Sequence, residues 1–545
     1  MEILALENLS FRYPAEEKDT LSHISLSIEE GDFCVLCGTS GCGKTTLMKL
    51  IKRELAPHGT LSGEIRFCGK AQGELSARES SADIGYVLQN PEAQIVTDKV
   101  WHELSFGLEN LGCGTEYIRL RIGEMANYFG IAHMFREGTS YLSGGQKQLL
   151  SLAAVMAMSP KLLLLDEPTS QLDPIAAADF IGTLKKLNRE LGTTIIIAEH
   201  RLEELLPIAD KVAVLENGAL AAFGTPQKVC RELGGTPIFA GFPTAARIWQ
   251  KLGGTGEAPL TVREGRKFLE QRVKIASLSE KTNAKNEKNT LTEQKNTPAL
   301  TLAEVFFRYE KSAPDILRGA SLSLREGEFF CLLGANGAGK TTVLRAAAGL
   351  AKPYKGKIKA HGKKTVLLPQ NVQNVFIKST VREDIEDMLA IYGAKKDEIG
   401  EKAFSLAEKL GVTHLLGKHP YDLSGGEAQK CALAKVLAAS PDILLLDEPT
   451  KAIDPAAKRE LAHIVRELCR GGVAVLAVTH DVEFAAENAD RCALFFDGEI
   501  LAPAAPQVFF SANNFYTTAA SRISRGMLEN AVTESDVLRL LEVAK

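Results

Sequence analysis

The segment FCVLCGTSGCGKTTLMKLIKREL, residues 33–55, contains the pattern on which the expected architecture rests. An apolar, strand-like run ends at Gly38, a glycine-rich loop follows, and helical spacing begins at Thr45. This order is typical of a phosphate-binding loop, in which backbone N–H groups and a helix N-terminus present partial positive charge to phosphate oxygens. We expect Lys44 to reach the β- and γ-phosphates of a nucleotide and the Thr45 hydroxyl to coordinate Mg²⁺.

The same series of motifs occurs twice along the chain, which indicates a duplicated domain. A second loop, GANGAGKTT, begins at Gly334; LSGGQ at Leu142 is matched by LSGGE at Leu423; and LLLLDEPTSQLDP at Leu162 is matched by ILLLDEPTKAIDP at Ile443. The order of the motifs is the same in both copies. The second copy is shorter between its glycine-rich loop and the run TVLLPQ that follows it.

Each copy has a pair of carboxylates directly after a continuous apolar run. Asp166 and Glu167 follow Leu162–Leu165, and Asp447 and Glu448 follow the corresponding run. Such a run fits a central parallel strand, whose carboxyl end is the edge at which open α/β sheets bind ligands. Because adjacent strand side chains point to opposite faces, the two acids should have different tasks. We expect the aspartate to help hold Mg²⁺ and the glutamate to act as general base on the attacking water.

A histidine and a glutamine complete each expected site. TTIIIAEH ends at His200 and VAVLAVTH ends at His480, and we expect both histidines to contact the γ-phosphate rather than to be structural. Gln89 and Gln370 each follow an apolar run, IGYVLQ and TVLLPQ. A glutamine at that edge can ligate Mg²⁺ and order the attacking water.

LSGGQ and LSGGE predict a second helix N-terminus in each copy. Ser143 precedes two glycines and the helical stretch KQLLSLAAVMA, so open N–H groups would form a further anion site. Each copy already has a phosphate loop. We therefore expect this second site to cap the nucleotide held by the other copy, in a head-to-tail pairing. The alternative is a simple N-cap followed by a glycine turn.

Composition and charge exclude several classes of protein. The 545 residues are 45% hydrophobic and 24% charged, which excludes a disordered, collagen-like or disulfide-scaffold chain. With 64 basic and 68 acidic residues the net charge is −4, which disfavours bulk nucleic-acid binding. We find no apolar run long enough to span a membrane and no secretory signal. Cys34 and Cys37 form a CxxC that we interpret as core packing in a reducing compartment.

The repeats and the composition between them predict five segments. Residues 276–298 contain few apolar side chains, which predicts a flexible linker that spans on the order of 25 Å as a coil, enough for two domains to face each other. The segments are an α/β domain over 1–225, a helical appendage over 226–275, the linker over 276–298, a second α/β domain over 299–505 and a C-terminal appendage over 506–545.

Together these motifs resemble the nucleotide-binding domains of ATP-binding-cassette (ABC) proteins. The resemblance covers both copies and implies two tandem P-loop NTPase (RecA-like) α/β domains, each with a helical subdomain and a small antiparallel β-subdomain. It also implies an ATP sandwich, here an intramolecular head-to-tail pseudo-dimer. In the family an aromatic residue stacks on adenine, a place taken here by Tyr13 and Tyr309. Asp173 and Asp454 match the aspartate of the family's D-loop.

The expected sites bind ATP and Mg²⁺ and comprise matching residues in both copies. The catalytic residues are Gln89, Glu167 and His200, and Gln370, Glu448 and His480. The Mg²⁺ ligands are Thr45, Gln89 and Asp166, and Thr341, Gln370 and Asp447. The ATP-binding residues of the first copy are Tyr13, Gly38, Thr39, Ser40, Gly41, Cys42, Gly43, Lys44, Thr45, Thr46, Ser143, Gly144, Gly145, Gln146 and Asp173. Those of the second copy are Tyr309, Gly334, Ala335, Asn336, Gly337, Ala338, Gly339, Lys340, Thr341, Thr342, Ser424, Gly425, Gly426, Glu427 and Asp454.

A narrower resemblance lies in VLQNPEAQIVTDKVWHELSFGLENLG, which begins at Val87. It is similar to the ATPases of energy-coupling factor (ECF) transporters, whose Gln-Asn-Pro-x-x-Gln motif falls on Gln89, Asn90, Pro91 and Gln94. This resemblance implies the ATPase of an importer for a vitamin or metal ion, peripheral on the cytoplasmic face of the cell membrane. Its partners would be a transmembrane scaffold subunit and a substrate-binding membrane subunit, to which the helical subdomains would pass the movement.

The alternative is a soluble, ribosome-associated ABC-F-type ATPase, which also carries two cassettes in one chain. Such proteins usually insert a long Arg/Lys-rich helical linker, whereas the linker here is rich in Asn and Thr with mixed charge, so we expect no nucleic-acid partner. A non-catalytic homologue is disfavoured because Glu167 and Glu448 are both present, and we expect two hydrolysing sites. The copies differ at QNVQNVF, which lacks a clean match to Pro91 and Gln94, and at Lys451, which replaces Ser170.

Overall fold

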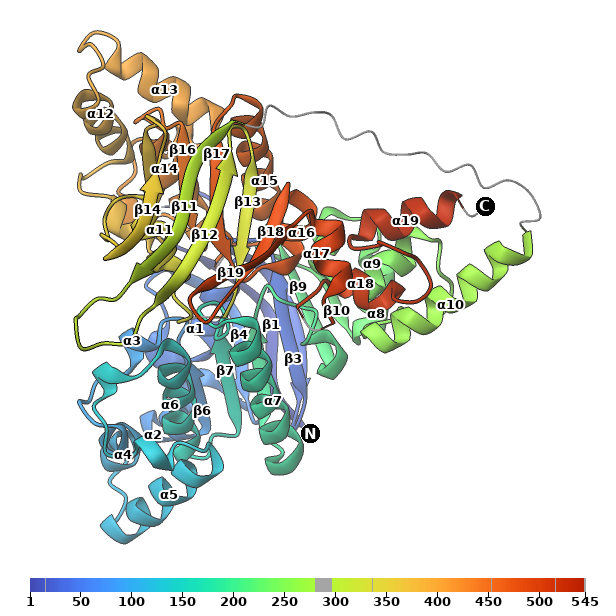
Figure 1. Ribbon diagram of the computed structural model, residues 1–545. Helices are drawn as coiled ribbons and strands as arrows, with labels where there is room; N and C mark the ends of the chain where they lie inside the picture. Colours follow the sequence, from blue (N-terminus) through green and yellow to red (C-terminus); the bar gives the residue numbers. More distant parts are fainter. Residues whose placement is uncertain (15, 280–296, 336, 452, 515, 544–545) are drawn as a thin grey trace. The chain divides into compact units, whose positions relative to one another are not determined.

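The computed structural model describes residues 1–14, 16–279, 297–335, 337–451, 453–514 and 516–543 (Figure 1). These residues divide into two compact units. Unit 1 comprises Met1–Gln250 with Gly254–Thr261, and unit 2 comprises Lys251–Gly253 with Val262–Lys545. Each unit contains one complete copy of the duplicated motifs.

The core of unit 1 is a six-stranded sheet with the order β10-β9-β3-β8-β7-β6. The strands from β9 to β6 are parallel, and β10 pairs antiparallel at one edge. Leu162–Leu165 of β7 are completely buried, and burial of each leucine side chain contributes about 1.5–3 kcal/mol. The strands are β3 (Phe33–Gly38), β6 (Ile84–Val87), β7 (Leu162–Asp166), β8 (Thr194–Ala198), β9 (Lys211–Glu216) and β10 (Ala219–Gly224).

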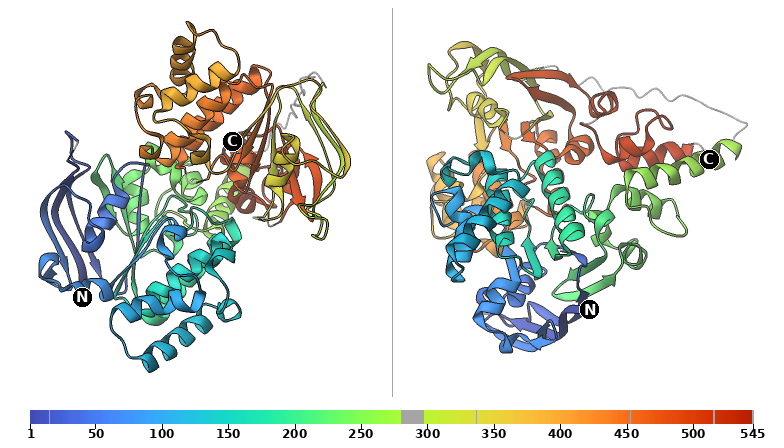
Figure 2. Two further views of the ribbon diagram at one scale, coloured as in Figure 1. Left: turned by 90° about the vertical axis from the view of Figure 1, so that its left-hand side faces the viewer. Right: turned by 90° about the horizontal axis from the view of Figure 1, so that it is seen from below.

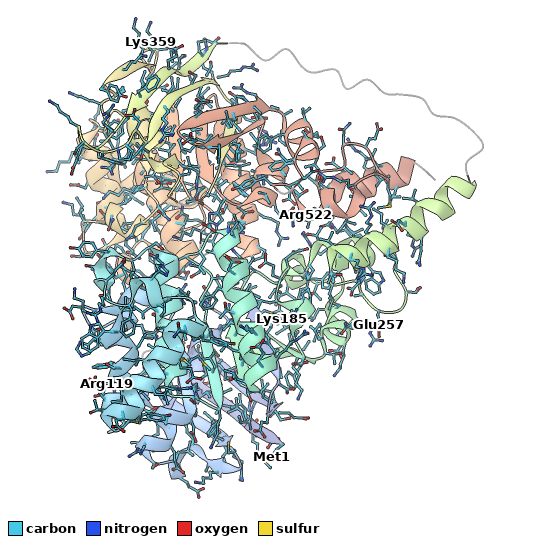
Figure 3. All side chains as sticks on the ribbon, turned by 60° about the horizontal axis from the view of Figure 1, so that its bottom comes forward. Met1, Arg119, Lys185, Glu257, Lys359 and Arg522 are labelled. Carbon is cyan, nitrogen blue, oxygen red and sulfur yellow. The ribbon has the colours of Figure 1, made fainter. Side chains whose placement is uncertain are left out.

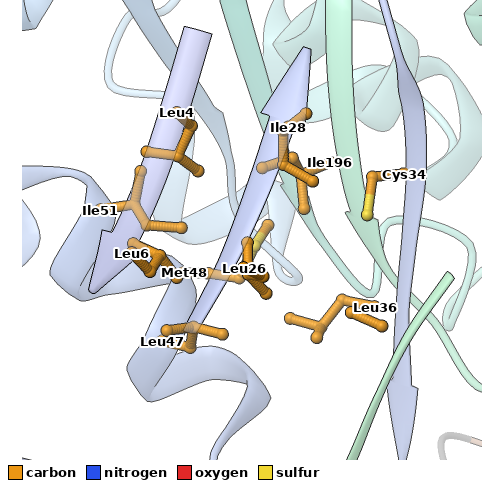
Figure 4. Close-up of a pocket in the computed structure, with 11 residues that line it drawn as sticks. Leu4, Leu6, Leu26, Ile28, Cys34, Leu36, Leu47, Met48, Ile51 and Ile196 are labelled. Atoms are coloured by element: carbon orange, nitrogen blue, oxygen red, sulfur yellow. The ribbon is translucent and has the colours of Figure 1, made fainter. Parts of the chain in front are cut away.

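A four-stranded sheet with the order β2-β1-β4-β5 forms the antiparallel part of unit 1. Its apolar residues share one core cluster with α1 and with the parallel sheet. Figure 4 shows a cavity in this cluster that is lined only by apolar side chains, among them Leu4, Leu26 and Met48, so it is part of the core. The strands are β1 (Glu2–Arg12), β2 (Leu21–Glu29), β4 (Thr60–Phe67) and β5 (Lys70–Ala71).

The helical part of unit 1 lies between β6 and β7 in the sequence and contains α3 to α6. In Figure 2 its cyan helices lie away from the blue antiparallel sheet of the same unit, and Arg119 marks α5 in Figure 3. Helix α7 begins at its N-cap Asp173 and ends at Gly192, which adopts a left-handed conformation. The helices are α1 (Lys44–Ile51), α2 (Ala77–Asp83), α3 (Pro91–Gln94), α4 (Val100–Asn110), α5 (Thr115–Tyr128), α6 (Gly144–Ala157), α7 (Pro174–Leu191), α8 (Pro226–Leu233) and α9 (Thr244–Lys251).

Unit 2 repeats this architecture with a shorter antiparallel part. Its six-stranded sheet has the order β15-β16-β17-β13-β18-β19, parallel from β15 to β18, and its antiparallel sheet has the order β12-β11-β14. The expected pair of α/β domains, each with a helical and an antiparallel part, is therefore confirmed. The strands are β11 (Pro298–Phe307), β12 (Leu317–Arg325), β13 (Phe329–Leu333), β14 (Lys355–Lys359), β15 (Thr365–Leu368), β16 (Ile443–Asp447), β17 (Ala474–Thr479), β18 (Arg491–Phe496) and β19 (Glu499–Ala504).

The helices of unit 2 include one that precedes its first strand in the sequence. Helix α10 packs against α18 of the C-terminal appendage, and Lys251 Nζ lies 2.7 Å from Glu534 Oε1. Helix α10 continues four residues into the segment predicted as a linker; residues 280–296 of that segment lie outside the described residues. The helices are α10 (Val262–Ser279), α11 (Lys340–Ala347), α12 (Val381–Ile391), α13 (Ile399–Lys409), α14 (Gly425–Leu437), α15 (Pro455–Arg470), α16 (Val482–Asn488), α17 (Pro506–Ala512), α18 (Ala519–Ser524) and α19 (Glu534–Val543).

Two further features concern the membrane and the cysteines. Among the described residues, every helix is too short or too polar to cross a lipid bilayer. Cys34 and Cys37 lie buried within β3, where loss of solvation raises the pKa of both thiols, that of Cys37 to about 12. Both therefore remain protonated near neutral pH and pack as small apolar groups.

Candidate functional site

The two glycine-rich loops join a buried strand to the start of a helix, as the sequence predicts. Gly43 has φ of +98° and Gly339 has φ of +110°, which favours glycine at both positions. A Cβ on Gly43 would also lie 2.5 Å from Leu21 Cδ2 and 3.0 Å from the Thr20 carbonyl oxygen, so a larger residue would force its neighbours to shift. The Lys44 ammonium donates to the carbonyls of Gly38 and Thr39, both at 3.1 Å. The loop thus folds back around its own lysine, which is buried.

The expected Mg²⁺ ligands meet in both units. Thr45 Oγ1 donates to Asp166 Oδ1 at 3.1 Å, and Thr341 Oγ1 donates to Asp447 Oδ1 at 3.2 Å. Burial raises the pKa of both aspartates, because a carboxylate loses solvation inside the protein. A hydroxyl and a buried carboxylate at hydrogen-bond distance are hard oxygen ligands, which fit Mg²⁺.

Tyr86 is a residue of this site that sequence reasoning missed. Its phenol donates to Asp166 Oδ2 at 3.3 Å, and burial followed by the nearby Asp166 charge raises the pKa of the phenol. The position lies in the apolar run IGYVLQ, and nothing in the spacing of that run indicates a contact with Asp166. At the corresponding position of the second copy, TVLLPQ has a leucine, so the surroundings of the two aspartates differ.

Glu167 and Glu448 each occupy a strained backbone position directly after a central strand. Their φ angles are +45° and +51°, in the left-handed region that residues with a Cβ rarely adopt. In both units the N–H of the glutamate donates to a carbonyl of the neighbouring strand, that of Ala198 or Val478, at 2.9 Å. Strained residues of this kind cluster at active sites, and the same strain in both copies marks these two carboxylates.

The carboxylate contacts differ between the units. In unit 1 the Gln89 amide donates to Glu167 Oε2 at 2.9 Å, and His200 Nε2 lies 3.0 Å from Glu167 Oε1. These three predicted catalytic side chains therefore meet. In unit 2 the expected trio is only partly assembled, because Gln370 is exposed and, within the described residues, forms no hydrogen bond to Glu448.

Glu448 is instead surrounded by cationic and donor groups. His480 Nδ1 lies 2.8 Å from Glu448 Oε2, and Lys340 Nζ lies 3.6 Å from Glu448 Oε1. Burial by itself would raise the pKa of Glu448, but the hydrogen bond from His480 and the charges of His480 and Lys340 outweigh it. The pKa of Glu448 is therefore lowered, and the group stays ionised near neutral pH.

The LSGG segments begin α6 and α14 with capping boxes. The Gln146 N–H donates to Ser143 Oγ at 3.3 Å, while the Ser143 N–H donates to Gln146 Oε1 at 2.8 Å. In unit 2, Glu427 Oε2 accepts from the N–H and the hydroxyl of Ser424. Gln146 and Glu427, predicted as ATP-binding residues, thus also stabilise their own helix starts.

Packing within unit 1 does not explain the glycines of this segment. Gly144 is the first residue of α6, and a Cβ placed on it would meet nothing within 4 Å. A Cβ on Gly145 would make only ordinary contacts, the nearest at 3.7 Å. The backbone at these two glycines is therefore open on the side where a Cβ would stand.

The remaining predicted residues lie at two places around the loops. The Tyr13 hydroxyl lies 3.1 Å from Thr46 Oγ1, and the Tyr309 hydroxyl lies 3.3 Å from Thr342 Oγ1, so both rings stand beside the helix that follows the loop. Asp173 and Asp454 are the N-caps of α7 and α15. Asn336 lies outside the described residues.

Gln94 forms hydrogen bonds with the backbone just before Gln89. Its side-chain carbonyl accepts from the Leu88 N–H at 2.8 Å, and its amide donates to the Tyr86 carbonyl at 3.2 Å. Gln94 thereby fixes the turn immediately before Gln89. The second copy has QNVQNVF at this place, and the absence of a match to Gln94 was the sequence signal for a difference between the two loops.

Comparison with known proteins identifies the family of these sites. The family described as "ABC transporter" matches residues 21–170 and 317–451. A protein of Bacillus thuringiensis, provisionally named an ABC transporter ATP-binding protein, is 41% identical over 98% of this chain and 97% of its own length. One of Streptomyces avermitilis with the same provisional name is 34% identical over 92% and 93%.

Two solved structures are also similar. CbiO1 of Clostridium perfringens, part of the ABC transporter complex CbiONQ, is 31% identical and covers 44% of this chain and 97% of its own, with a TM-score of 0.39. The archaeal ribosome recycling factor aABCE1, solved with the ribosomal stalk protein aP1, is 20% identical over 93% of this chain and 91% of its own, with a TM-score of 0.58. The second match supports the fold of the tandem domains.

Proposed function

The chain belongs to the ABC transporter family of ATP-binding proteins, and on that premise we propose that it is the ATPase subunit of an importer. Proteins of this family bind ATP with Mg²⁺ and hydrolyse it. The two copies would act as a head-to-tail pair, so that the LSGG segment of each caps the ATP bound by the other. ATP would close the pair and hydrolysis would open it, because only the γ-phosphate makes both sets of contacts.

In this mechanism the side chains of each copy have separate tasks. The loop N–H groups and Lys44 bind the phosphates, and Thr45 with Asp166 would hold Mg²⁺, which when bound neutralises charge on the β- and γ-phosphate oxygens. Glu167 accepts a proton from the attacking water, and Gln89 orients that water. His200 would contact the γ-phosphate. Thr341, Asp447, Glu448, His480 and Gln370 would take these roles in the second copy.

The observation that supports the head-to-tail proposal is that both LSGG segments form the N-terminus of a helix, and in the first copy a Cβ on Gly144 would meet no neighbour there. Gly144 is the first residue of α6, where the helix penalty of glycine is small, and a Cβ there meets no neighbour, so we expect Gly144→Ala to change the stability by less than about 0.5 kcal/mol. ATP turnover should nevertheless fall at least tenfold if a nucleotide approaches that surface. Thermal denaturation and steady-state phosphate release measure the two effects.

Gly123 provides a matched control for this variant. It lies inside α5, and a Cβ placed on it also meets nothing within 4 Å. Gly123→Ala should raise the stability by about 0.5–1 kcal/mol, because glycine is disfavoured inside a helix, and should leave turnover unchanged. Unchanged turnover in Gly144→Ala would contradict the assignment of the LSGG segment to a nucleotide site.

Exposed apolar side chains in both helical parts support a membrane partner. Val96 is 63% exposed and Ile377 is 69% exposed, at equivalent positions of the two copies. The segment that carries each is fixed by a buried acid: Glu103 accepts from the Val96 N–H, and Asp384 accepts from the Ile377 N–H, both at 3.1 Å. Single exposed apolar side chains are common on protein surfaces, but this one recurs at the equivalent position of both copies on a fixed segment, which suits docking on a partner. We propose that these segments contact the transmembrane scaffold subunit.

Val96→Asp with Ile377→Asp tests this surface. Burial of one such side chain is worth about 1.5–3 kcal/mol, so the double variant should lose at least about tenfold in association with detergent-extracted membrane subunits. Basal ATPase activity of the purified chain should be unchanged. Val508→Asp, at a 60% exposed position on α17, is the control and should leave association intact.

Purification of the tagged native chain from cells distinguishes the importer from the rival function. Co-sedimentation with ribosomes, without membrane subunits, would favour the ABC-F-type ATPase and contradict the importer. The resemblance of the segment from Val87 to ECF ATPases favours the importer of a vitamin or metal ion, at the cytoplasmic face of the membrane. Recovery of a scaffold subunit together with a substrate-binding subunit would support this narrower assignment.

A further inference from the structure

Glu199 is a buried acid beside the first catalytic centre to which the mechanism above gives no role. It follows the last residue of β8, directly before His200, and is 2% exposed. Glu199 Oε1 accepts from the N–H of Thr169 at 2.8 Å and from its hydroxyl at 2.6 Å. Glu199 Oε2 accepts from the His200 N–H at 3.1 Å. One carboxylate therefore ties the turn after Glu167 to the backbone of the histidine.

The second copy has Thr479 at this position, and its hydrogen bonds are arranged differently. The Thr479 hydroxyl lies 3.4 Å from that of Thr450, the counterpart of Thr169, and accepts from the Asp481 N–H at 3.0 Å. The His480 N–H now donates to Glu448 Oε2 at 3.3 Å. The backbone donor that Glu199 binds in the first copy is thus taken by the catalytic glutamate itself in the second.

This exchange of partners accompanies two different orientations of the catalytic carboxylate. In unit 1, Glu167 contacts the Gln89 amide through Oε2 and His200 Nε2 through Oε1, and its side chain is 15% exposed. In unit 2, Glu448 lies against His480 and within 3.6 Å of the Lys340 ammonium, with a side chain that is 5% exposed. The histidine also differs, because His200 faces its glutamate through Nε2 and His480 through Nδ1.

We propose that Glu199 is a positioning residue that holds Glu167 in the orientation used for hydrolysis, and that Thr479 makes the second site the slower one. The proposal rests on the roles of Glu167 and Glu448 given above. With Glu199 present, the His200 N–H and both donors of Thr169 are satisfied, so Glu167 stays directed toward Gln89. With Thr479 in its place, Glu448 turns to the His480 N–H and to Lys340. Both contacts must be given up before the carboxylate reaches water and the lysine reaches phosphate.

The reciprocal exchange of the two residues tests this assignment. In single-turnover phosphate release with saturating ATP, we expect the native chain to show a fast and a slow phase of equal amplitude. Glu199→Thr should slow the fast phase about tenfold or more, the scale expected when a reacting group is misplaced. The dissociation constant for ATP should change less than twofold. Thr479→Glu should accelerate the slow phase by a similar factor, whereas Thr479→Gln, which has the same size but no carboxylate, should not.

The outcomes separate a positioning role from a structural one. If Glu199 were only structural, Glu199→Thr would lower the melting temperature and change ATP binding and turnover together. Thr479→Glu would then give no gain of rate in the second copy. If Thr479→Glu does not fold, Glu199→Thr decides alone: an unchanged fast phase, or a single phase unaffected by the substitution, overturns the proposal. If the double glutamine variant of Glu167 and Glu448 keeps its turnover, the proposed catalytic roles fail instead. If that variant is inactive and the exchanges change nothing, only the role of Glu199 fails.

Discussion

Replacing Glu167 and Glu448 together by glutamine is expected to lower ATP turnover by about 10²-fold or more, the scale of removing a general base. Both carboxylates lie at the carboxyl ends of central strands, in strained left-handed conformations, next to a histidine. Glutamine has nearly the same size and can keep hydrogen bonds at these positions, but it cannot take a proton from water. ATP binding should therefore persist while hydrolysis stops, and the protein should retain ATP in its closed form.

Steady-state phosphate release and retention of labelled ATP after rapid gel filtration measure these two effects. Glu216→Gln is a matched control, because Glu216 also ends a strand of the parallel sheet in unit 1 but is exposed. It should leave both measurements unchanged. Near-normal turnover in the double variant would contradict the assignment of Glu167 and Glu448 as general bases.

The meeting of the predicted site residues could be anticipated because strand order and strand ends are encoded in short patterns. An apolar run that ends in an acid predicts a buried strand with its functional residue at the carboxyl edge, and parallel strands bring such ends together. Thr45 and Asp166 are far apart in the sequence, yet their contact follows from that rule. The same rule predicted that Gln89, Glu167 and His200 would meet.

The order of strands and strand ends does not predict which hydrogen bonds the buried carboxylates of the site accept. Glu199 is part of the segment TTIIIAEH, but motif spacing does not reveal from which groups a buried carboxylate accepts hydrogen bonds. Two of the donors to Glu199 belong to Thr169, in the turn that follows the strained residue Glu167. The spacing from Gln89 to Glu167 equals that from Gln370 to Glu448, so motif spacing gives no sign that the surroundings of the two carboxylates differ.

The packing of the helix after the first α/β domain was also beyond the sequence patterns. The segment 226–275 was predicted as an appendage of that domain, and its helical character is present in α8, α9 and α10. Helix α10, however, packs against α18, which follows the second α/β domain. Helical spacing predicts that such a segment is a helix, but not which distant partner covers its apolar side.

Lys435 and Asp384 form a buried ion pair that should be among the most important single contacts for the stability of unit 2. Lys435 Nζ lies 2.5 Å from Asp384 Oδ1, and the residues are 4% and 0% exposed. Asp384 also accepts from the Ile377 N–H, and Lys435 donates to the Val375 carbonyl at 2.7 Å. The pair thus fixes the segment that presents Ile377 to solvent. A buried charge that loses its partner is strongly destabilising, because solvation was given up when it was buried.

Lys435→Met should therefore lower the stability of unit 2 by about 3–5 kcal/mol. The double variant Lys435→Met with Asp384→Asn should recover most of this loss, since no uncompensated charge remains. The first copy shows that this segment can be held without the lysine: Glu103 is satisfied there by the N–H groups of Val96 and Thr97 and by the Thr97 hydroxyl. Chemical denaturation gives the stability, and hydrogen exchange at the Ile377 amide reports the segment itself. If the single variant unfolds within about 1 kcal/mol of the native chain, the pair does not stabilise the docking segment, and the membrane contact proposed for Ile377 loses its structural basis.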